Sequence, residues 1–102
     1  MSKTGIQFIE NERKRQIEIE GWTAEHDKQH DDGQLARAAA CYAFAPFLKD
    51  DIRDGYKLPL GMWPEYWLAK YWKPVPEDRI KELAKAGALI AAEIDRLIAK
   101  TK

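Results

Sequence analysis

The chain of 102 residues has a single cysteine, so no disulfide can form within it. Cys41 lies in the apolar run at residues 38–43, which predicts a small buried side chain rather than a nucleophile. Because an unpaired cysteine is typical of a reducing compartment, we expect a cytoplasmic protein.

The sequence also lacks an excess of charge of either sign and a long apolar run. Acidic and basic residues number 17 each, so there is no positive excess to neutralise the phosphates of DNA or RNA. No positively charged start leads into an apolar stretch, and no run of about 18 apolar residues occurs. We therefore expect neither general nucleic-acid binding nor a membrane anchor.

Internal repeats, low-complexity tracts and strand-like alternation are missing as well. Hydrophobic residues make up 45% of the chain, enough for one core in a chain of this length. The sequence predicts a single all-α domain, residues 1–102. It should be a small bundle of three main helices with a long aromatic-rich loop that contains a short helix.

The first predicted helix covers residues 5–20 and ends at Gly21. Ile6, Ile9 and Ile17 share one face of it at helical spacing. The same face carries charged residues, namely Glu10, Arg13 and Glu20. Part of this face should border a wet cleft, unless the charges lie at its rim with their stems over apolar surface.

The second predicted helix runs from about residue 33 to 45, with Asp31 or Asp32 as its cap and Pro46 at its end. Its many alanines allow another helix to approach closely. The last helix should start with Pro76 at its first position and carry a long apolar stripe. Gly87 within that stripe predicts tight contact with the alanine-rich second helix.

The segment between these helices, residues 49–76, is broken by glycine and proline yet rich in tyrosine and tryptophan. Pro64 should start a short helix that ends near Tyr71. The aromatic rings are expected to pack as satellite core under a long loop. The alternative is a stacking platform for a base, for which Trp22 and Trp72 are the candidates.

The densest cluster of potential ligands lies between the first two helices, at residues 26–32. If this segment forms a helical turn, His26 and His30 lie four residues apart on one face. Asp27 and Asp31 share a face for the same reason. Paired imidazoles bind divalent transition metals, whereas paired carboxylates bind Mg²⁺ that bridges phosphates. The spacing leaves both metals open, and a solvated loop that caps the second helix remains the alternative.

Seven segments that cover most of the chain carry a family resemblance. They are ERKRQI (12–17), EGWTAEHD (20–27), DGQLA (32–36), AAACYA (38–43), WKP (72–74), LAKAGALI (83–90) and AEIDRL (92–97). In these segments the chain resembles a family of small phage and prophage proteins similar to the MazG-type all-α nucleoside triphosphate pyrophosphohydrolases and to a phage dATP/dGTP diphosphohydrolase. The Gly21-Trp22 pair and the aromatic loop are also similar to the small ligand-binding repeat of ryanodine receptors.

The first resemblance implies a bundle in which carboxylates of two helices hold Mg²⁺ on a triphosphate while water attacks and releases pyrophosphate. The family pattern is Glu-Glu-x-x-Glu on one helix and Glu-x-x-Asp on a later one. Leu35 stands where the last carboxylate of the first motif is expected, and Lys85 replaces the aspartate of the second. Neither side chain binds magnesium. A protein that binds a nucleotide or nucleotide-derived signal without cleaving it is therefore the alternative.

These considerations give a predicted site. Asp31, Asp32 and Glu20 are the candidate catalytic residues, and His26, Asp27, His30 and Asp31 the candidate metal ligands. Arg13, Trp22, Lys85 and Trp72 are the candidate ligand-binding residues, with Arg13 and Lys85 on phosphate. A third function class is a protein-interaction inhibitor, whose expected sign is an exposed aromatic patch at residues 63–72. The resemblance also implies assembly of subunits, and we expect a homodimer in a bacterial or phage-infected cell.

Overall fold

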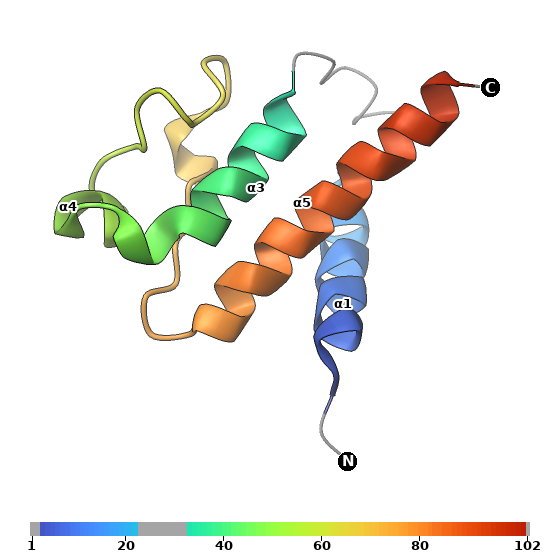
Figure 1. Cartoon of the computed structure of the whole chain (residues 1–102), viewed down its shortest axis with the longest axis horizontal. Helices are drawn as coiled ribbons and strands as arrows, with labels where there is room; N and C mark the ends of the chain where they lie inside the picture. Colours follow the sequence, from blue (N-terminus) through green and yellow to red (C-terminus); the bar gives the residue numbers. More distant parts are fainter. Residues whose placement is uncertain (1–2, 23–32, 102) are drawn as a thin grey trace.

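The computed structural model describes residues 3–22 and 33–101, and the regular secondary structure in this part of the chain is all helical, with no strand. Three long helices are arranged with α5 beside both α1 and α3, and a chain of short elements connects α3 to α5 (Figure 1). The elements are α1 (Gly5–Glu18), α3 (Gln34–Phe44), the 3₁₀ turn η1 (Ala45–Phe47), α4 (Asp50–Arg53), the 3₁₀ turn η2 (Ala69–Tyr71) and α5 (Arg79–Lys100). The predicted all-α fold is confirmed.

Helix α1 begins with a capping box that the sequence analysis did not identify. The hydroxyl of Thr4 accepts from the amide of Gln7, whose side chain in turn accepts from the amide of Thr4. The three isoleucines of the predicted face differ in burial: Ile6 is 79% exposed and Ile17 37%, whereas Ile9 lies against Gly87 of α5. The side chains of α1 that are buried are Glu12 and Gln16. Hydrogen bonds to polar partners make their burial possible.

Helix α3 packs against α5 through small residues, as the alanines predicted. Ala38 and Ala39 of α3 and Ala86 and Ala92 of α5 belong to the same buried cluster. Its cap position is Gly33, with a positive φ of 79° and no side-chain hydrogen bond, rather than an aspartate. The helix ends at Phe44, just before Pro46, where no amide hydrogen is available to continue it.

Gly87 has a different neighbour from the one predicted. A Cβ at this position would lie 2.5 Å from Cδ1 of Ile9, so the glycine admits α1, not α3. The glycine marks a close approach, but the sequence does not identify the partner.

Helix α5 starts three residues later than predicted, at Arg79 instead of Pro76. Asp78 is its N-cap and accepts a hydrogen bond from the amide of Lys81. The preceding segment is held by Glu82, which is fully buried and accepts from the amide of Val75 and from Arg53 and Arg79. Because the carboxylate of Glu82 binds the amide of Val75, the residues just before Asp78 stay outside the helix, and α5 starts later than predicted.

The aromatic loop packs mainly as core. Trp63 and Trp72 are buried against Tyr42, with Trp72 4.9 Å from the Tyr42 ring. The predicted helix from Pro64 is wrong: the structure has turns there, and only Ala69–Tyr71 is a 3₁₀ turn. The short helix α4 was not predicted. None of the helices in the described ranges combines the length and apolar character needed to cross a bilayer.

Candidate ligand pocket between α1, α3 and α5

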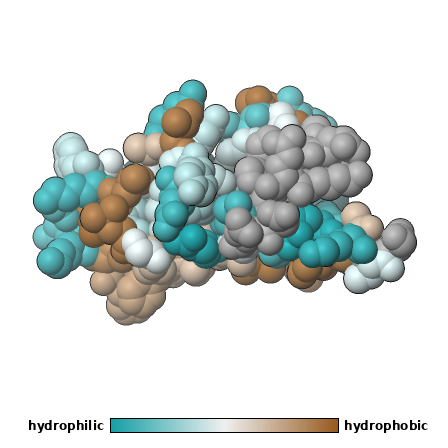
Figure 2. Space-filling view, turned by 90° about the horizontal axis from the view of Figure 1, so that it is seen from above, coloured by the Kyte–Doolittle hydropathy of each residue, from teal (hydrophilic) through white to brown (hydrophobic). Residues whose placement is uncertain are grey.

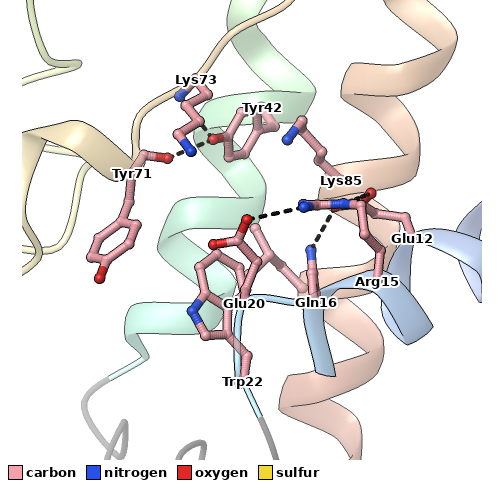
Figure 3. Close-up of a pocket in the computed structure, with 10 residues that line it drawn as sticks. Glu12, Arg15, Gln16, Glu20, Trp22, Tyr42, Tyr71, Lys73 and Lys85 are labelled. Atoms are coloured by element: carbon pink, nitrogen blue, oxygen red, sulfur yellow. Dashed lines mark hydrogen bonds and ion pairs between the residues drawn. The ribbon is translucent and has the colours of Figure 1, made fainter. Parts of the chain in front are cut away.

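A pocket opens where the C-terminal half of α1 faces α3, α5 and the aromatic loop (Figure 3). Its volume is about 310 Å³, including space open to solvent. Charged and aromatic side chains dominate its wall, which is formed by Glu12, Arg15, Gln16, Glu20, Trp22, Tyr42, Tyr71, Lys73, Lys85 and Leu89. The pocket thus brings residues of the first helix, α1, next to residues of the last helix, α5.

The α1 wall of the pocket is a connected polar row. Arg15 donates to both carboxylate oxygens of Glu12, from Nε at 2.7 Å and from the terminal nitrogen at 2.8 Å. Its other terminal nitrogen donates to Glu20 at 3.0 Å. Residues 12, 16 and 20 are four apart, so one face of a helix and its C-terminal extension carries them all.

Lys85 extends from α5 into this polar wall and is 9% exposed. Burial lowers its pKa, and the charge of Glu12 opposes that effect only in part. For Glu12, burial works to raise the pKa, but hydrogen bonds from Arg15 and the charge of Lys85 outweigh it and lower the pKa. The pocket thus holds a buried ammonium beside a carboxylate that is already bound to an arginine.

Tyr42 connects the pocket to the loop. Its hydroxyl donates to the carbonyl of Tyr71 at 2.8 Å and accepts from the amide of Lys73 at 3.0 Å. Burial raises the pKa of Tyr42, which therefore stays protonated at neutral pH. The ammonium of Lys85 lies 5.8 Å from the centre of the Tyr42 ring, within the range of a cation–π contact.

Two rings border the pocket beside these charges. Trp22 and Tyr71 meet edge to face, with centroids 6.0 Å apart, and Trp22 also contacts Trp67. Small-molecule pockets are commonly lined by aromatic side chains with a few polar or charged groups, and this wall contains both.

Gln16 leaves one polar atom without a partner. Its side chain is 1% exposed, and its amide nitrogen donates to Glu12 at 3.3 Å. A carboxylate requires a donor, so the nitrogen must face Glu12 and the oxygen must point elsewhere. Within the described part of the chain, that oxygen accepts no hydrogen bond. A ligand that donates an N–H or O–H to it would satisfy it.

The structure brings three of the predicted site residues together: Glu20, Trp22 and Lys85 all line the pocket. Arg13 lies nearby, where it donates to the carbonyl of Trp22 at 3.2 Å and approaches Asp95 of α5 at 3.8 Å. It supports the backbone at the pocket but does not line it.

Trp72 lies in the core, where its indole N–H donates to the carbonyl of Ile52 at 3.1 Å. Glu10, one of the charged residues on the predicted face of the first helix, has a side chain that is 59% exposed and pairs with Lys14 at 3.4 Å. Neither residue is part of the pocket wall.

The predicted metal and catalytic residues His26, Asp27, His30, Asp31 and Asp32 lie outside the described residues. Within residues 3–22 and 33–101, no group of three histidine, cysteine or carboxylate side chains is arranged to hold a metal ion.

Sequence reasoning missed most of the polar wall, including Glu12, Arg15, Gln16, Tyr42 and Lys73. The sequence signal that could have identified it was the repeat of polar residues at 12, 16 and 20. The isoleucines on the same helix predict a different buried face and obscured this repeat.

No family model, curated protein or solved structure matches this chain.

Proposed function

We propose that this protein binds a nucleotide, or a small molecule derived from one, in the pocket between α1, α3 and α5. The observation that carries the proposal is Lys85, a buried ammonium in a pocket bordered by the rings of Trp22 and Tyr71. Phosphate oxygens would bind the ammonium, and a base would lie against the rings.

The charges on the pocket wall favour an anion. Three cations, Arg15, Lys73 and Lys85, face two carboxylates, Glu12 and Glu20. A phosphate can replace Glu20 as the partner of Arg15, since that contact is a single hydrogen bond whereas the contact with Glu12 is a double one. The unpartnered oxygen of Gln16 favours a ligand that also carries an N–H donor, as most bases do.

Binding requires movement of side chains. The enclosed part of the pocket has room for little more than one water molecule, because the volume of about 310 Å³ includes space that is open to solvent. Separation of Arg15 from Glu20 would widen it, and rotamer changes of this kind are common on ligand binding.

Hydrolysis is the second candidate function. It needs Mg²⁺ on free carboxylates, and those in the described wall, Glu12 and Glu20, are held by Arg15. The pyrophosphohydrolase proposal therefore depends on Asp31 and Asp32, with Glu20 in support. Its favourable observation is connectivity: the chain passes from Trp22, at the pocket, directly into the segment that carries His26, Asp27, His30 and both aspartates.

The interaction-module alternative has less support. Its expected aromatic patch would need exposed rings at residues 63–72, but Trp63 and Trp72 are buried and Tyr66 alone of the aromatic residues there is largely exposed, at 90%. We retain the cytoplasm of a bacterial or phage-infected cell as the proposed location.

Calorimetric titration with a panel of deoxynucleoside triphosphates and cyclic nucleotides, with and without Mg²⁺, tests the proposal. Lys85→Met should weaken binding by about tenfold or more, as expected for loss of a charge-assisted hydrogen bond. The matched control is Lys81→Met, on an exposed position of the same helix outside the pocket. Equal affinity of both variants and the wild type, or no binding at all, would overturn the proposal.

Chromatography of the same samples separates binding from hydrolysis. Magnesium-dependent release of pyrophosphate that disappears in Asp31→Asn/Asp32→Asn, with nucleotide affinity retained, would support the enzyme. Intact ligand after prolonged incubation would establish a binding protein instead.

A further inference from the structure

The aromatic loop forms a second pocket with α3, which we call the loop pocket. Its wall consists of Arg37 of α3 and of loop residues between 58 and 65, and it shares no residue with the pocket described above. Its volume is about 590 Å³, including space open to solvent. Hydrophobic residues reach the surface at several places on the face shown in Figure 2, so an apolar wall alone does not identify a binding site. The loop pocket is distinguished by two charged groups beside its apolar wall.

The loop backbone holds the apolar side of this pocket in place. Pro59 and Pro64 are fully buried, and the carbonyl of Pro59 accepts from the amides of Met62 and Trp63. Gly61 has a positive φ of 87°, a conformation that glycine adopts without strain. The turn therefore needs little ordering when a ligand binds. The apolar side chains that it presents to the pocket are those of Leu58, Leu60, Trp63 and Pro64.

The two charged groups of the loop pocket are Arg37 and Glu65, and neither has an ion-pair partner among the described residues. Arg37 is half-buried, and within this part of the chain its guanidinium donates a single hydrogen bond, to the carbonyl of Trp63 at 3.3 Å. Glu65 is exposed. Because these two side chains line one pocket without pairing with each other, a ligand that carries both charges can bind between them.

A further donor in the wall lacks an acceptor. Trp63 is 5% exposed, and its indole nitrogen is buried but donates no hydrogen bond within residues 3–22 and 33–101. An unsatisfied donor of this kind favours a ligand that brings an acceptor. A carboxylate suits this role, since its two oxygens have about four lone-pair sites and can accept from a guanidinium and an indole together.

We propose that the loop pocket binds a free α-amino acid with an apolar side chain. The carboxylate of the ligand accepts from Arg37, its ammonium pairs with Glu65, and its side chain lies against the apolar residues of the loop. A zwitterion fits better than a simple acid or amine, because either of these would leave one charge of the pocket unpaired and facing a ligand without the opposite charge. This inference does not depend on the pocket between α1, α3 and α5 or on its ligand.

Calorimetric titration with L-leucine and L-phenylalanine tests the inference. The wild type should bind at least one of them saturably, and it should not bind L-aspartate, whose side chain is charged. 4-Methylpentanoate and 3-methylbutylamine, which are leucine without its ammonium and without its carboxylate, should each bind at least about tenfold more weakly than leucine. Glycyl-leucine keeps the carboxylate and the side chain but displaces the ammonium. If it bound as tightly as leucine, the site would recognise a peptide C-terminus and the assignment to a free amino acid would be wrong.

Variants of the two charged residues locate the site. Glu65→Gln should weaken binding of the amino acid by about tenfold, whereas Glu77→Gln, the same change at an exposed residue outside both pockets, should not. Arg37→Gln should have a similar effect, with Lys49→Gln as its exposed control. Lys85→Met should leave this affinity unchanged, which separates the result from that for the nucleotide. The inference is overturned if the wild type binds neither amino acid, or if Glu65→Gln and Arg37→Gln bind as tightly as the wild type.

Discussion

Helix α5 has two interfaces of opposite character within one chain. Against α3 it contributes small apolar residues such as Ala86 and Ala92 to the buried cluster, and Arg79 adds hydrogen bonds to the carbonyls of Tyr42 and Ala43 only at the N-terminal end of α5. Against α1 it meets Glu12 and Gln16, buried polar groups that are bound to Arg15 or to each other. The dry interface can hold the fold without specific partners, whereas the polar interface is stable only while each group keeps its partner. The pocket opens at the polar interface.

The largest expected effect concerns a buried charge away from the pocket. Glu82→Ala removes the carboxylate that accepts from Val75 and from two arginines, and leaves Arg53 poorly solvated. We expect a loss of roughly 3 to 5 kcal/mol in the free energy of unfolding. Urea denaturation would measure it, and Glu82→Gln, which keeps an acceptor oxygen, should cost less. Equal losses would show that the acceptor oxygen contributes nothing and that the whole effect comes from the charge.

The dry interface should respond to cavity formation. Leu35 of α3 is 1% exposed, and Leu35→Ala should cost about 3 kcal/mol, because the alanines in the same cluster carry only methyl groups, which are too short to fill the cavity. Leu60→Ala, at a mostly exposed site, should leave the denaturation midpoint nearly unchanged. A loss at Leu35 no greater than at Leu60 would contradict the assignment of this interface as the core.

Gly87→Ala tests the approach of α1. The added methyl group would collide with Ile9, whose branched side chain has few alternative rotamers in a helix. We expect destabilisation of about 2 kcal/mol despite the better helix propensity of alanine. In a double-mutant cycle, Ile9→Ala should relieve most of that loss; additive effects of the two changes would show that the residues do not interact.

The smallest effect should be a change of pH dependence at the polar interface. The lowered pKa of Glu12 means that its stabilisation is present above its ordinary value of 4.5 and is lost as the pH falls through the folded-state pKa. Glu12→Gln should therefore be less stable than the wild type at neutral pH, by about 1 kcal/mol. The difference between the two proteins should shrink below pH 4.5, and thermal unfolding at several pH values would reveal it. A constant difference would exclude this linkage.

The contrast between the interfaces also explains what the sequence could predict. Alanines at helical spacing identify a close helix pair whatever their exact partners, so the contact of α3 with α5 was predictable. On α1 the isoleucines indicated a buried face, but Glu12 and Gln16 are buried instead, because Arg15 supplies partners that a helical pattern does not reveal. For the same reason the helical pattern predicted Glu20 but not the rest of the polar row, and Lys85 was predicted through the family resemblance.

The rings described above form an unbroken series from the pocket edge into the core. Trp22 lies 6.4 Å from Trp67, Trp67 lies 5.7 Å from Trp63, and Trp63 lies 5.5 Å from Trp72, with Tyr42 next. At such separations the electronic transitions of neighbouring rings couple. The near-ultraviolet circular dichroism of this protein should therefore be a collective signal, in which a displacement of Trp22 at the pocket alters bands that arise from indoles deep in the core.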